Sequence, residues 1–172
     1  NVGGGYVYTA TSPEGPWTKH RSQGCYYDMG LLIVDDDKMY VAYGNTVISV
    51  AELSADGFNE VRSQRVFTTP STLSGPLEGS RFYKIKGNYY IFPTQYANGE
   101  YVLRSTSGPF GPDTLQKFAV KLPFAGTSTG AGAAPHQGGI VQTQNGDWYY
   151  MAFNDSYPAG RIPVLAPMTW SN

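Results

Sequence analysis

The fold is decided by three stretches of one form: Asp28-Met-Gly-Leu-Leu-Ile-Val34, Glu78-Gly-Ser-Arg-Phe-Tyr-Lys84 and His136-Gln-Gly-Gly-Ile-Val-Gln142. Each stretch leads through a polar turn into an aromatic-rich segment, at Met39–Tyr43, Tyr89–Phe92 and Trp148–Phe153 respectively. A short apolar strand, a polar turn and a second strand are typical of a β-hairpin. The sequence therefore predicts three hairpins of the same kind.

Each hairpin opens on an ionisable side chain: Asp28, Glu78 or His136. An aromatic residue follows 12 positions later in every case, at Tyr40, Tyr90 and Trp148. If the hairpins are equivalent units of one repeat, the three opening residues occupy equivalent places in the fold. This equivalence is the main indication of function.

The repeat extends beyond the hairpin to four strands. Third strands are predicted at Tyr6–Thr9, Thr46–Ala51 and Glu100–Arg104, and fourth strands at Val61–Thr69 and Leu115–Leu122. Turns rich in Ser, Pro and Gly separate them. Four strands in about 50 residues, repeated along the chain, predict an all-β fold of the β-propeller type. The stretch Gly126–Ala134 is expected to be a loop between blades.

The number of blades follows from this repeat. The chain is expected to open on the last two strands of one blade and to continue with two full blades, at about 28–70 and 78–122. A further blade begins at His136 and stops after its third strand. Residues 1–172 are thus predicted to form part of a single propeller domain, roughly three to four blades. The inner strands of the first blade and a final blade are expected to lie outside the sequence.

The composition is consistent with a protein that faces carbohydrate. A formal net charge of -1 over 172 residues gives no electrostatic reason to expect nucleic acid or an anionic membrane as partner. Aromatic residues make up 15% of the chain and charged residues only 15%, a balance found in β-rich secreted proteins that bind sugars. Cys25 is the single cysteine, which excludes an internal disulfide, and it is interpreted as a small buried side chain.

The opening residues are expected to surround one mouth of the central channel, because the innermost strand of each blade runs along the axis. The loops between second and third strands then line the rim, at 44–46, 94–98 and 154–161. Cleavage of a glycosidic bond needs a general acid and a second carboxylate that activates water or attacks carbon. A neighbouring carboxylate raises the pKa of such an acid by like-charge repulsion, and Asp28 beside Glu78 suits that part.

Five phrases that cover nearly the whole chain resemble glycoside hydrolase family 43. They are Ser12-Pro-Glu-Gly-Pro-Trp17, the hairpin from Tyr27 to Asp37, Leu77-Glu-Gly-Ser80 leading to Tyr83-Lys84, His136-Gln-Gly-Gly139 leading to Gly146-Asp-Trp148, and Gly160-Arg-Ile-Pro-Val-Leu-Ala-Pro167 followed by Trp170. Members of that family are five-bladed propeller enzymes that remove arabinose or xylose from plant cell-wall polysaccharides. The resemblance therefore implies a five-bladed β-propeller, of which this chain is a part.

The resemblance also implies catalytic roles. Glu78 matches the general acid of an inverting mechanism, and Asp28 matches the aspartate that tunes the pKa of the acid and orients it. The third family acid, an aspartate base, has no match here and is expected upstream of Asn1. Asp35, Asp36 and Asp37 are interpreted as solvated turn residues, and Asp155 is a rim residue that is a candidate to touch substrate but not to replace the base.

Further site residues follow from the resemblance and from position. His136 matches the axial histidine that in many family members contacts a central calcium ion or its water shell, and a hydrogen-bonding role is an equal alternative. Arg161 matches an arginine that reaches the substrate or the tuning aspartate. Candidate sugar contacts from position alone are Tyr27, Asn45, Gln95 and Gln137. No cofactor is expected for the chemistry, and any calcium is expected to be structural.

The leading functional prediction is an exo-acting α-L-arabinofuranosidase of arabinoxylan or arabinan side chains. The first alternative is a β-xylosidase that releases xylose from xylo-oligosaccharides, and the second is a non-catalytic sugar-binding propeller. The expected partners are plant cell-wall polysaccharide and the remainder of the same propeller, with no nucleic acid and no membrane. Because that polysaccharide lies outside the cell, the protein is expected to be secreted.

Overall fold

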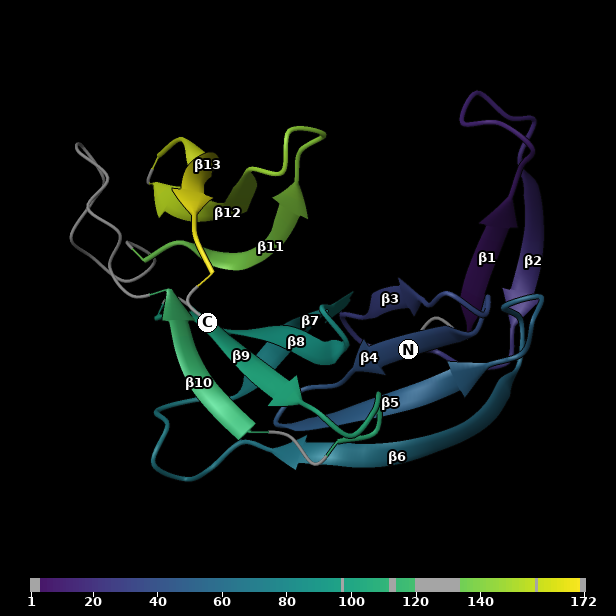
Figure 1. Cartoon of the computed structure of the whole chain (residues 1–172), viewed down its shortest axis with the longest axis horizontal. Helices are drawn as coiled ribbons and strands as arrows, with labels where there is room; N and C mark the ends of the chain where they lie inside the picture. The colour runs from purple at the N-terminus through teal and green to yellow at the C-terminus, as the bar shows by residue number, and fades with distance from the viewer. Residues whose placement is uncertain (1–3, 97, 112–113, 120–133, 157, 171–172) are drawn as a thin grey trace.

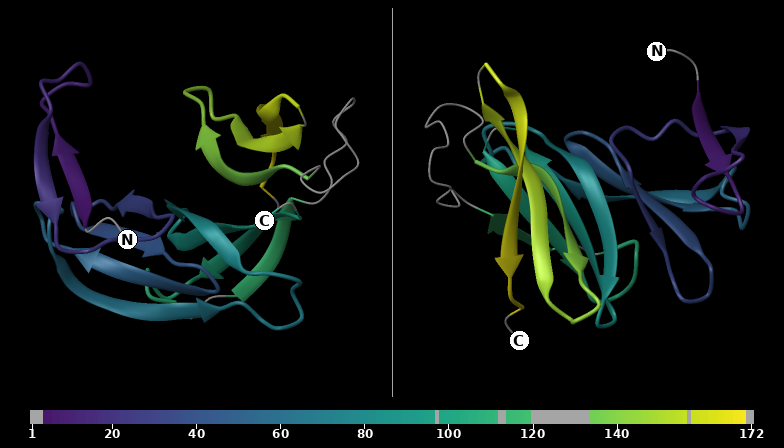
Figure 2. Two further views of the ribbon diagram at one scale, coloured as in Figure 1. Left: turned by 180° about the vertical axis from the view of Figure 1, so that it is seen from behind. Right: turned by 90° about the horizontal axis from the view of Figure 1, so that it is seen from above.

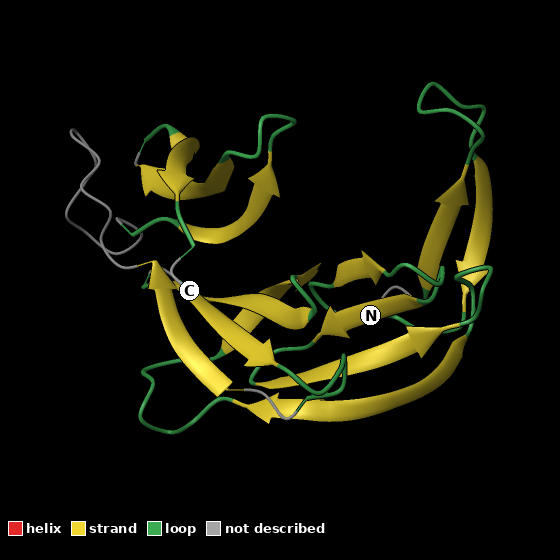
Figure 3. Ribbon diagram, in the orientation of Figure 1, coloured by secondary structure: helices red, strands yellow, loops and turns green. Residues whose placement is uncertain are grey.

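The chain folds into strands and turns. The computed structural model describes residues 4–96, 98–111, 114–119, 134–156 and 158–170. Within those ranges there is no helix, so none that could span a membrane, as Figure 3 shows. The strands pair in antiparallel fashion into four sheets. The all-β prediction is therefore confirmed.

The four sheets follow the order of the chain. The first contains β1 (Gly5–Thr9) and β2 (Thr18–Ser22), and the second contains β3 (Gly30–Ile33), β4 (Met39–Tyr43), β5 (Val47–Leu53) and β6 (Glu60–Thr68). The third contains β7 (Leu77–Ile85), β8 (Asn88–Gln95), β9 (Gly99–Ser105) and β10 (Thr114–Ala119). The fourth contains β11 (His136–Gln142), β12 (Trp148–Ser156) and β13 (Gly160–Met168). Each sheet pairs neighbours in sequence, as the blades of a propeller do.

The sheets are arranged as blades around an arc. Figure 1 shows β3, β7 and β11 turned toward the open centre and β6 and β10 at the periphery. The view from behind in Figure 2 shows the same arc. The inner strands are neighbours, because β7 packs against both β3 and β11. The predicted blade order is confirmed: two strands of one blade, two full blades and three strands of a fourth. Most of the predicted loop at 126–134 lies outside the described residues.

The core lies between the blades. One apolar cluster joins Leu32 and Ile48 of the second sheet to Phe82, Ile91 and Leu103 of the third. A second cluster joins the third sheet to the fourth, and its members are Phe92, Val102, Ile140, Tyr150 and Ala152. The adjacent residues Ile91 and Phe92 point to opposite faces of β8, so the third sheet is covered on both sides. Each buried side chain of this size contributes about 1.5–3 kcal/mol of burial free energy.

Two sheet faces stay uncovered, one on the second sheet and one on the fourth. On β3, Leu31 and Ile33 are exposed although Leu32 between them is buried. On the fourth sheet, Val141, Met151 and Leu165 are exposed on the face opposite the second apolar cluster. Buried and exposed side chains alternate along these strands, so the exposed ones share the sheet face that is turned away from the apolar clusters.

The three hairpins differ in how they open and in their registers, since Asp28 precedes its strand whereas Glu78 and His136 belong to theirs. Glu78 and His136 each precede a β-bulge, where two residues of the inner strand oppose one of its neighbour. The aromatic residues 12 positions later do not occupy equal places: Tyr40 pairs with Leu32, Tyr90 with Tyr83, and Trp148 with Gln142. The shift has two sources. Lys86 and Gly87 form a two-residue turn with positive φ angles of 49° and 80°, whereas the other two turns are longer. The second and third hairpins also carry a bulge that the pairing of β3 with β4 lacks, so the constant spacing does not extend to one common register.

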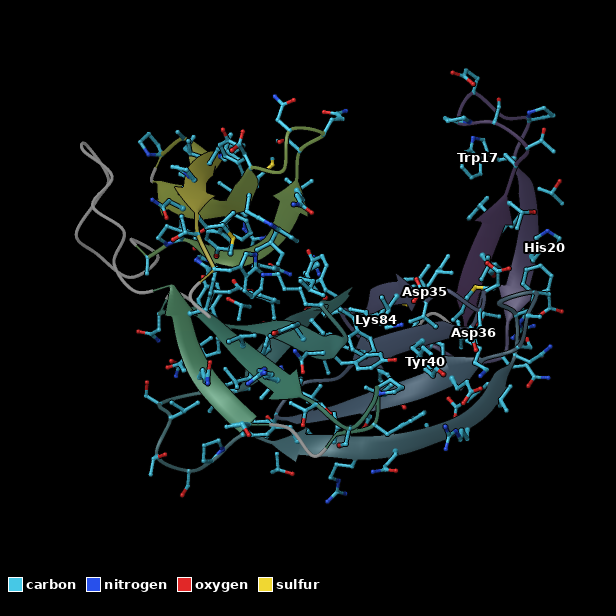
Figure 4. The ribbon with its side chains drawn as sticks, viewed as in Figure 1. Trp17, His20, Asp35, Asp36, Tyr40 and Lys84 are labelled. Carbon is cyan, nitrogen blue, oxygen red and sulfur yellow. The ribbon has the colours of Figure 1, made fainter. Side chains whose placement is uncertain are left out.

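Three side chains of the first hairpins are worth placing. Cys25 was interpreted as buried and is exposed. The ring of His20 on β2 stacks on Phe58 at 4.2 Å and thereby ties the first sheet to the second. Asp35 is a turn residue as predicted, but it also accepts a hydrogen bond from Lys84 of β7 at 2.7 Å, and Figure 4 shows these two residues side by side between the sheets.

Candidate active site

The predicted acid, Glu78, lies where three segments meet. It is the second residue of β7 and is half-buried. Its Oε2 atom accepts hydrogen bonds from the Tyr27 hydroxyl at 3.3 Å and from Asn45 Nδ2 at 2.5 Å. Tyr27 comes from the segment before β3, and Asn45 from the turn between β4 and β5. Two residues predicted as sugar contacts therefore hold the carboxylate of the predicted acid.

The turn between β4 and β5 orients Asn45. Gly44 and Thr46 adopt positive φ angles of 118° and 68°, so the turn is tight. The Thr46 hydroxyl donates to Asn45 Oδ1 at 2.9 Å, which leaves Nδ2 directed at Glu78. The Thr46 backbone amide donates to the carbonyl of Leu77 at 3.1 Å and ties the turn to the start of β7.

Asp28 lies on the same side of the site. It is half-buried with a positive φ angle of 48°, and it precedes β3 and is not part of it. The pKa of the Tyr27 phenol is raised, chiefly by the negative charge of Glu78 and next by that of Asp28. Both carboxylates are therefore close enough to Tyr27 to act on one hydroxyl group.

The contacts continue from Glu78 toward the fourth sheet. Thr94, which pairs with Glu78 on β8, accepts a hydrogen bond at its Oγ1 from the backbone amide of Gln137 at 3.0 Å. Gly79 has a positive φ of 68°, and a Cβ atom there would lie 3.1 Å from Gln137 Cγ. The Gln137 side chain therefore packs directly beside the predicted acid.

Gln95 is not brought to this group. It is 5% exposed, its Oε1 accepts from the Tyr101 hydroxyl at 3.1 Å, and its Nε2 donates to Ser74 Oγ at 3.4 Å. Its amide is thus engaged inside the third sheet.

His136, Asp155 and Arg161 form a second group on the rim. His136 is 1% exposed, and its Nδ1 lies 2.9 Å from the Ala134 carbonyl. Its Nε2 lies 3.5 Å from Asp155 Oδ2, and Asp155 Oδ1 lies 3.5 Å from Arg161 Nε. The guanidinium of Arg161 also covers the ring of Phe153 at 4.5 Å. Asp155 therefore stands between two residues that the resemblance assigned to the site.

The whole chain, residues 1–172, matches the family model described as glycosyl hydrolases family 43. The chain belongs to glycosyl hydrolase family 43. The propeller prediction is confirmed with it, since this chain is part of the five-bladed fold that related family 43 enzymes adopt.

Several relatives of this family 43 chain are known. A solved GH43 glycoside hydrolase, engineered in its active site to display both endo-xylanase and exo-arabinofuranosidase activity, is 48% identical, with a TM-score of 0.81 over 91% of this chain and 29% of its own. A non-reducing end α-L-arabinofuranosidase of Bacteroides ovatus, BoGH43B, is 29% identical over 97% of this chain and 34% of its own. A β-xylosidase of Formosa agariphila is 29% identical over 54% of this chain and 18% of its own. The chain thus spans about a third of the length of the first two.

The residues around His136 fit a calcium ion only in part. Its buried Nε2 atom has no hydrogen-bond partner among the residues that the structure describes, and one carboxylate, Asp155, lies nearby. Calcium takes six to eight oxygen ligands, and among the described residues no three His, Cys, Asp or Glu side chains gather as a metal site. His136 and Asp155 alone do not fit a directly bound calcium ion. They fit an ion whose water shell contacts His136.

Sequence reasoning missed one ionisable residue of this family 43 chain, Glu100. It lies on β9, is 0% exposed, and accepts hydrogen bonds from the Gly138 backbone amide at 3.0 Å and the Tyr150 hydroxyl at 3.2 Å. Burial raises the pKa of its carboxyl group to about 8. A signal was present in the sequence, because Glu100 and Val102 share one face of the strand and Val102 is apolar.

Proposed function

We propose that the protein containing this chain is an inverting, exo-acting glycoside hydrolase that releases L-arabinofuranose from side chains of arabinoxylan or arabinan. The observation that carries the proposal is the carboxylate of Glu78, held by Tyr27 and Asn45 at the start of β7. The pKa of the same Tyr27 phenol is raised by the negative charge of Glu78 and next by that of Asp28. A half-buried carboxyl group, oriented by two donors, suits proton donation to a leaving glycosidic oxygen.

The proposed roles follow from this geometry. Glu78 donates the proton, and Asp28 supplies the neighbouring negative charge. An inverting mechanism needs a separate base, about 6.5–9.5 Å from the acid, to activate water. We assign that base to sequence outside residues 1–172, because the relatives are about three times as long as the matched region. Arg161 and Gln137 are proposed to bind the sugar from the rim.

The proposed preference for arabinose over xylose rests on the activities named for two relatives. Exo-arabinofuranosidase activity is named for the engineered enzyme that is 48% identical, and BoGH43B is an α-L-arabinofuranosidase. The alternative function is that of a β-xylosidase. It is favoured by the similarity to the β-xylosidase of Formosa agariphila.

We also propose the setting of the enzyme. The remainder of the same propeller is proposed to cover the two apolar faces, which carry Leu31 and Ile33 on the second sheet and Val141 and Met151 on the fourth. The polymeric partner is plant cell-wall polysaccharide, so secretion is proposed. The net charge of -1 supports neither nucleic acid nor an anionic membrane as partner. Calcium is proposed only as an ion whose water shell contacts His136.

The test compares the complete wild-type protein with Glu78→Gln on 4-nitrophenyl α-L-arabinofuranoside, 4-nitrophenyl β-D-xyloside and arabinoxylan. The wild type is expected to act faster on the arabinoside. Glu78→Gln is expected to lower kcat on arabinoxylan by about 10²–10⁴. The loss on the nitrophenyl glycoside should be smaller, because nitrophenolate leaves without help from an acid.

The matched control is Glu52→Gln, which removes a carboxylate that pairs with Arg62 on the outer strands. It should leave both rates unchanged. Unchanged turnover in Glu78→Gln would overturn the assignment of the acid, and a faster wild-type rate on the xyloside would reverse the order of the two activities.

A further inference from the structure

Glu100 joins two blades with a polar contact in an otherwise apolar interface. It belongs to β9 of the third sheet, whereas both of its donors, Gly138 and Tyr150, belong to the fourth. The surrounding cluster of Phe92, Val102 and Ile140 is apolar. A buried carboxyl group costs folding free energy unless hydrogen bonds compensate for lost water. Its presence here therefore calls for a role that an apolar side chain cannot perform.

The contact falls on a bulge in β11. The pairing of β11 with β12 shifts between His136 and Gly139, and Gln137 adopts a positive φ of 52°. The ring of Tyr150 lies against Gly138, where a Cβ atom would come within 2.3 Å of it. The Tyr150 hydroxyl and the Gly138 amide thus reach the same carboxylate oxygen, Glu100 Oε2, from beneath the bulge.

The same bulge carries two predicted site residues. Gln137 packs against Gly79 beside Glu78, and His136 faces Asp155. A bulge with one extra residue has no complete ladder of its own to fix its backbone. A backbone shift there would move both side chains relative to the acid, so an anchor on the Gly138 amide controls their placement.

The charged and titratable groups that face Glu100 come from β7 and β12. Arg81 on β7 favours the ionised carboxyl group, and Tyr150 on β12 donates to it. Burial opposes ionisation more strongly and raises the pKa to about 8. The neutral acid retains an oxygen that accepts from Gly138, so the anchor does not depend on a negative charge.

We propose that Glu100 is a positioning residue of the active site, which fixes the β11 bulge from the neighbouring blade and thereby sets Gln137 beside Glu78 and His136 against Asp155. The positioning role rests on the proposed function, whereas the anchor itself does not. An amide side chain of the same length should serve equally well, because it offers an acceptor oxygen in the same place.

The test uses the complete protein with the variants Glu100→Gln and Glu100→Ala. Val102→Ala is the matched control, because it shortens a neighbouring side chain on the same face of β9 without touching the bulge. Glu100→Ala is expected to lower kcat/KM by about tenfold or more. It should also speed hydrogen exchange in a peptide that covers residues 136–142. In Glu100→Gln, kcat/KM and the exchange rate of residues 136–142 should both stay within about threefold of the wild type. Val102→Ala should lower the Tm without changing kcat/KM or that exchange rate.

The proposal is overturned if Glu100→Ala and Val102→Ala have the same kinetics and exchange, or if Glu100→Gln is as impaired as Glu100→Ala. If Glu100→Ala does not fold, Tyr150→Phe takes its place, since it removes one donor and keeps the ring. Normal kinetics and normal exchange in Tyr150→Phe would then overturn the proposal. A wild type inactive on every glycoside would refute the proposed function, while the exchange comparison would still decide whether Glu100 anchors the bulge.

Discussion

At the scale of single residues, Tyr27 and Asn45, which are predicted sugar contacts, hold the predicted acid. Asn45 is itself held by Thr46, so an ordered chain of hydrogen bonds runs from the β4–β5 turn to Glu78. Such a chain orients a carboxyl group before substrate arrives, which lowers the entropic cost of reaching a reactive geometry. Their proximity to Glu78 leaves both residues next to any sugar bound there.

Glu100 should make stability depend on pH. Its pKa is about 8 in the folded protein, against a model-compound value of 4.5. Between these values the folded state binds more protons than the unfolded state, so the free energy of unfolding falls as pH rises. This contribution is complete below pH 4.5 and is lost as pH passes through about 8. The slope is at most about 1.4 kcal/mol per pH unit.

Urea unfolding of the wild type and Glu100→Gln between pH 5 and 9 measures this effect. The wild type is expected to lose stability relative to the glutamine variant as pH rises, because glutamine does not titrate. Two curves that stay parallel across this range would contradict the prediction.

At the scale of elements, glycine permits the close approach of inner strands. A Cβ atom on Gly30 of β3 would lie 2.6 Å from the carbonyl oxygen of Ser80 and 2.8 Å from Arg81 Cα. Both atoms belong to the backbone of β7, so no side-chain rotation relieves the overlap. Gly30 is thus required by the packing of β3 on β7, the strand that carries the predicted acid.

Gly30→Ala is expected to destabilise the protein by about 1–3 kcal/mol, as overpacking of a tight interface does. Gly75→Ala is the control, because nothing lies within 4 Å of a Cβ atom there, and it should change stability by less than about 0.5 kcal/mol. Chemical denaturation of both variants measures the difference. Equal effects would show that β3 and β7 are not in close contact.

At the scale of the whole molecule, the uncovered apolar face of β3 is expected to behave differently from the solvent-facing surface of the outer strand β6. Leu31 is 51% exposed in this chain, and Val61 on the outer strand β6 is 61% exposed. If the remainder of the propeller covers the first face, only Leu31 becomes buried in the complete protein. Leu31→Asp should then cost more than about 2 kcal/mol, because it buries an unpaired charge.

Val61→Asp should cost no more than about 0.5 kcal/mol in the complete protein. Thermal and urea unfolding of the two variants give the comparison. Similar small losses for both would mean that the face of β3 stays open to solvent, and the proposed closure of the propeller would fail.

The sequence by itself determined the elements and their order. The period of two in the strands, the turn residues and the four-strand repeat are local signals, and they predicted the blades, the opening residues and the family. They carried no information on the register of Tyr90 and Trp148, because turn lengths and bulges shift the pairing without changing the spacing.

Only the tertiary structure decided how side chains from different blades meet. Asn45 and Glu78 are separated by 33 residues, and Gly138 and Glu100 by 38, yet each pair forms a hydrogen bond. No local periodicity encodes such contacts, because they depend on how one sheet packs on the next. The burial of Glu100 and the place of Asp155 between His136 and Arg161 arise in the same way, from packing between blades and across the strands of one blade.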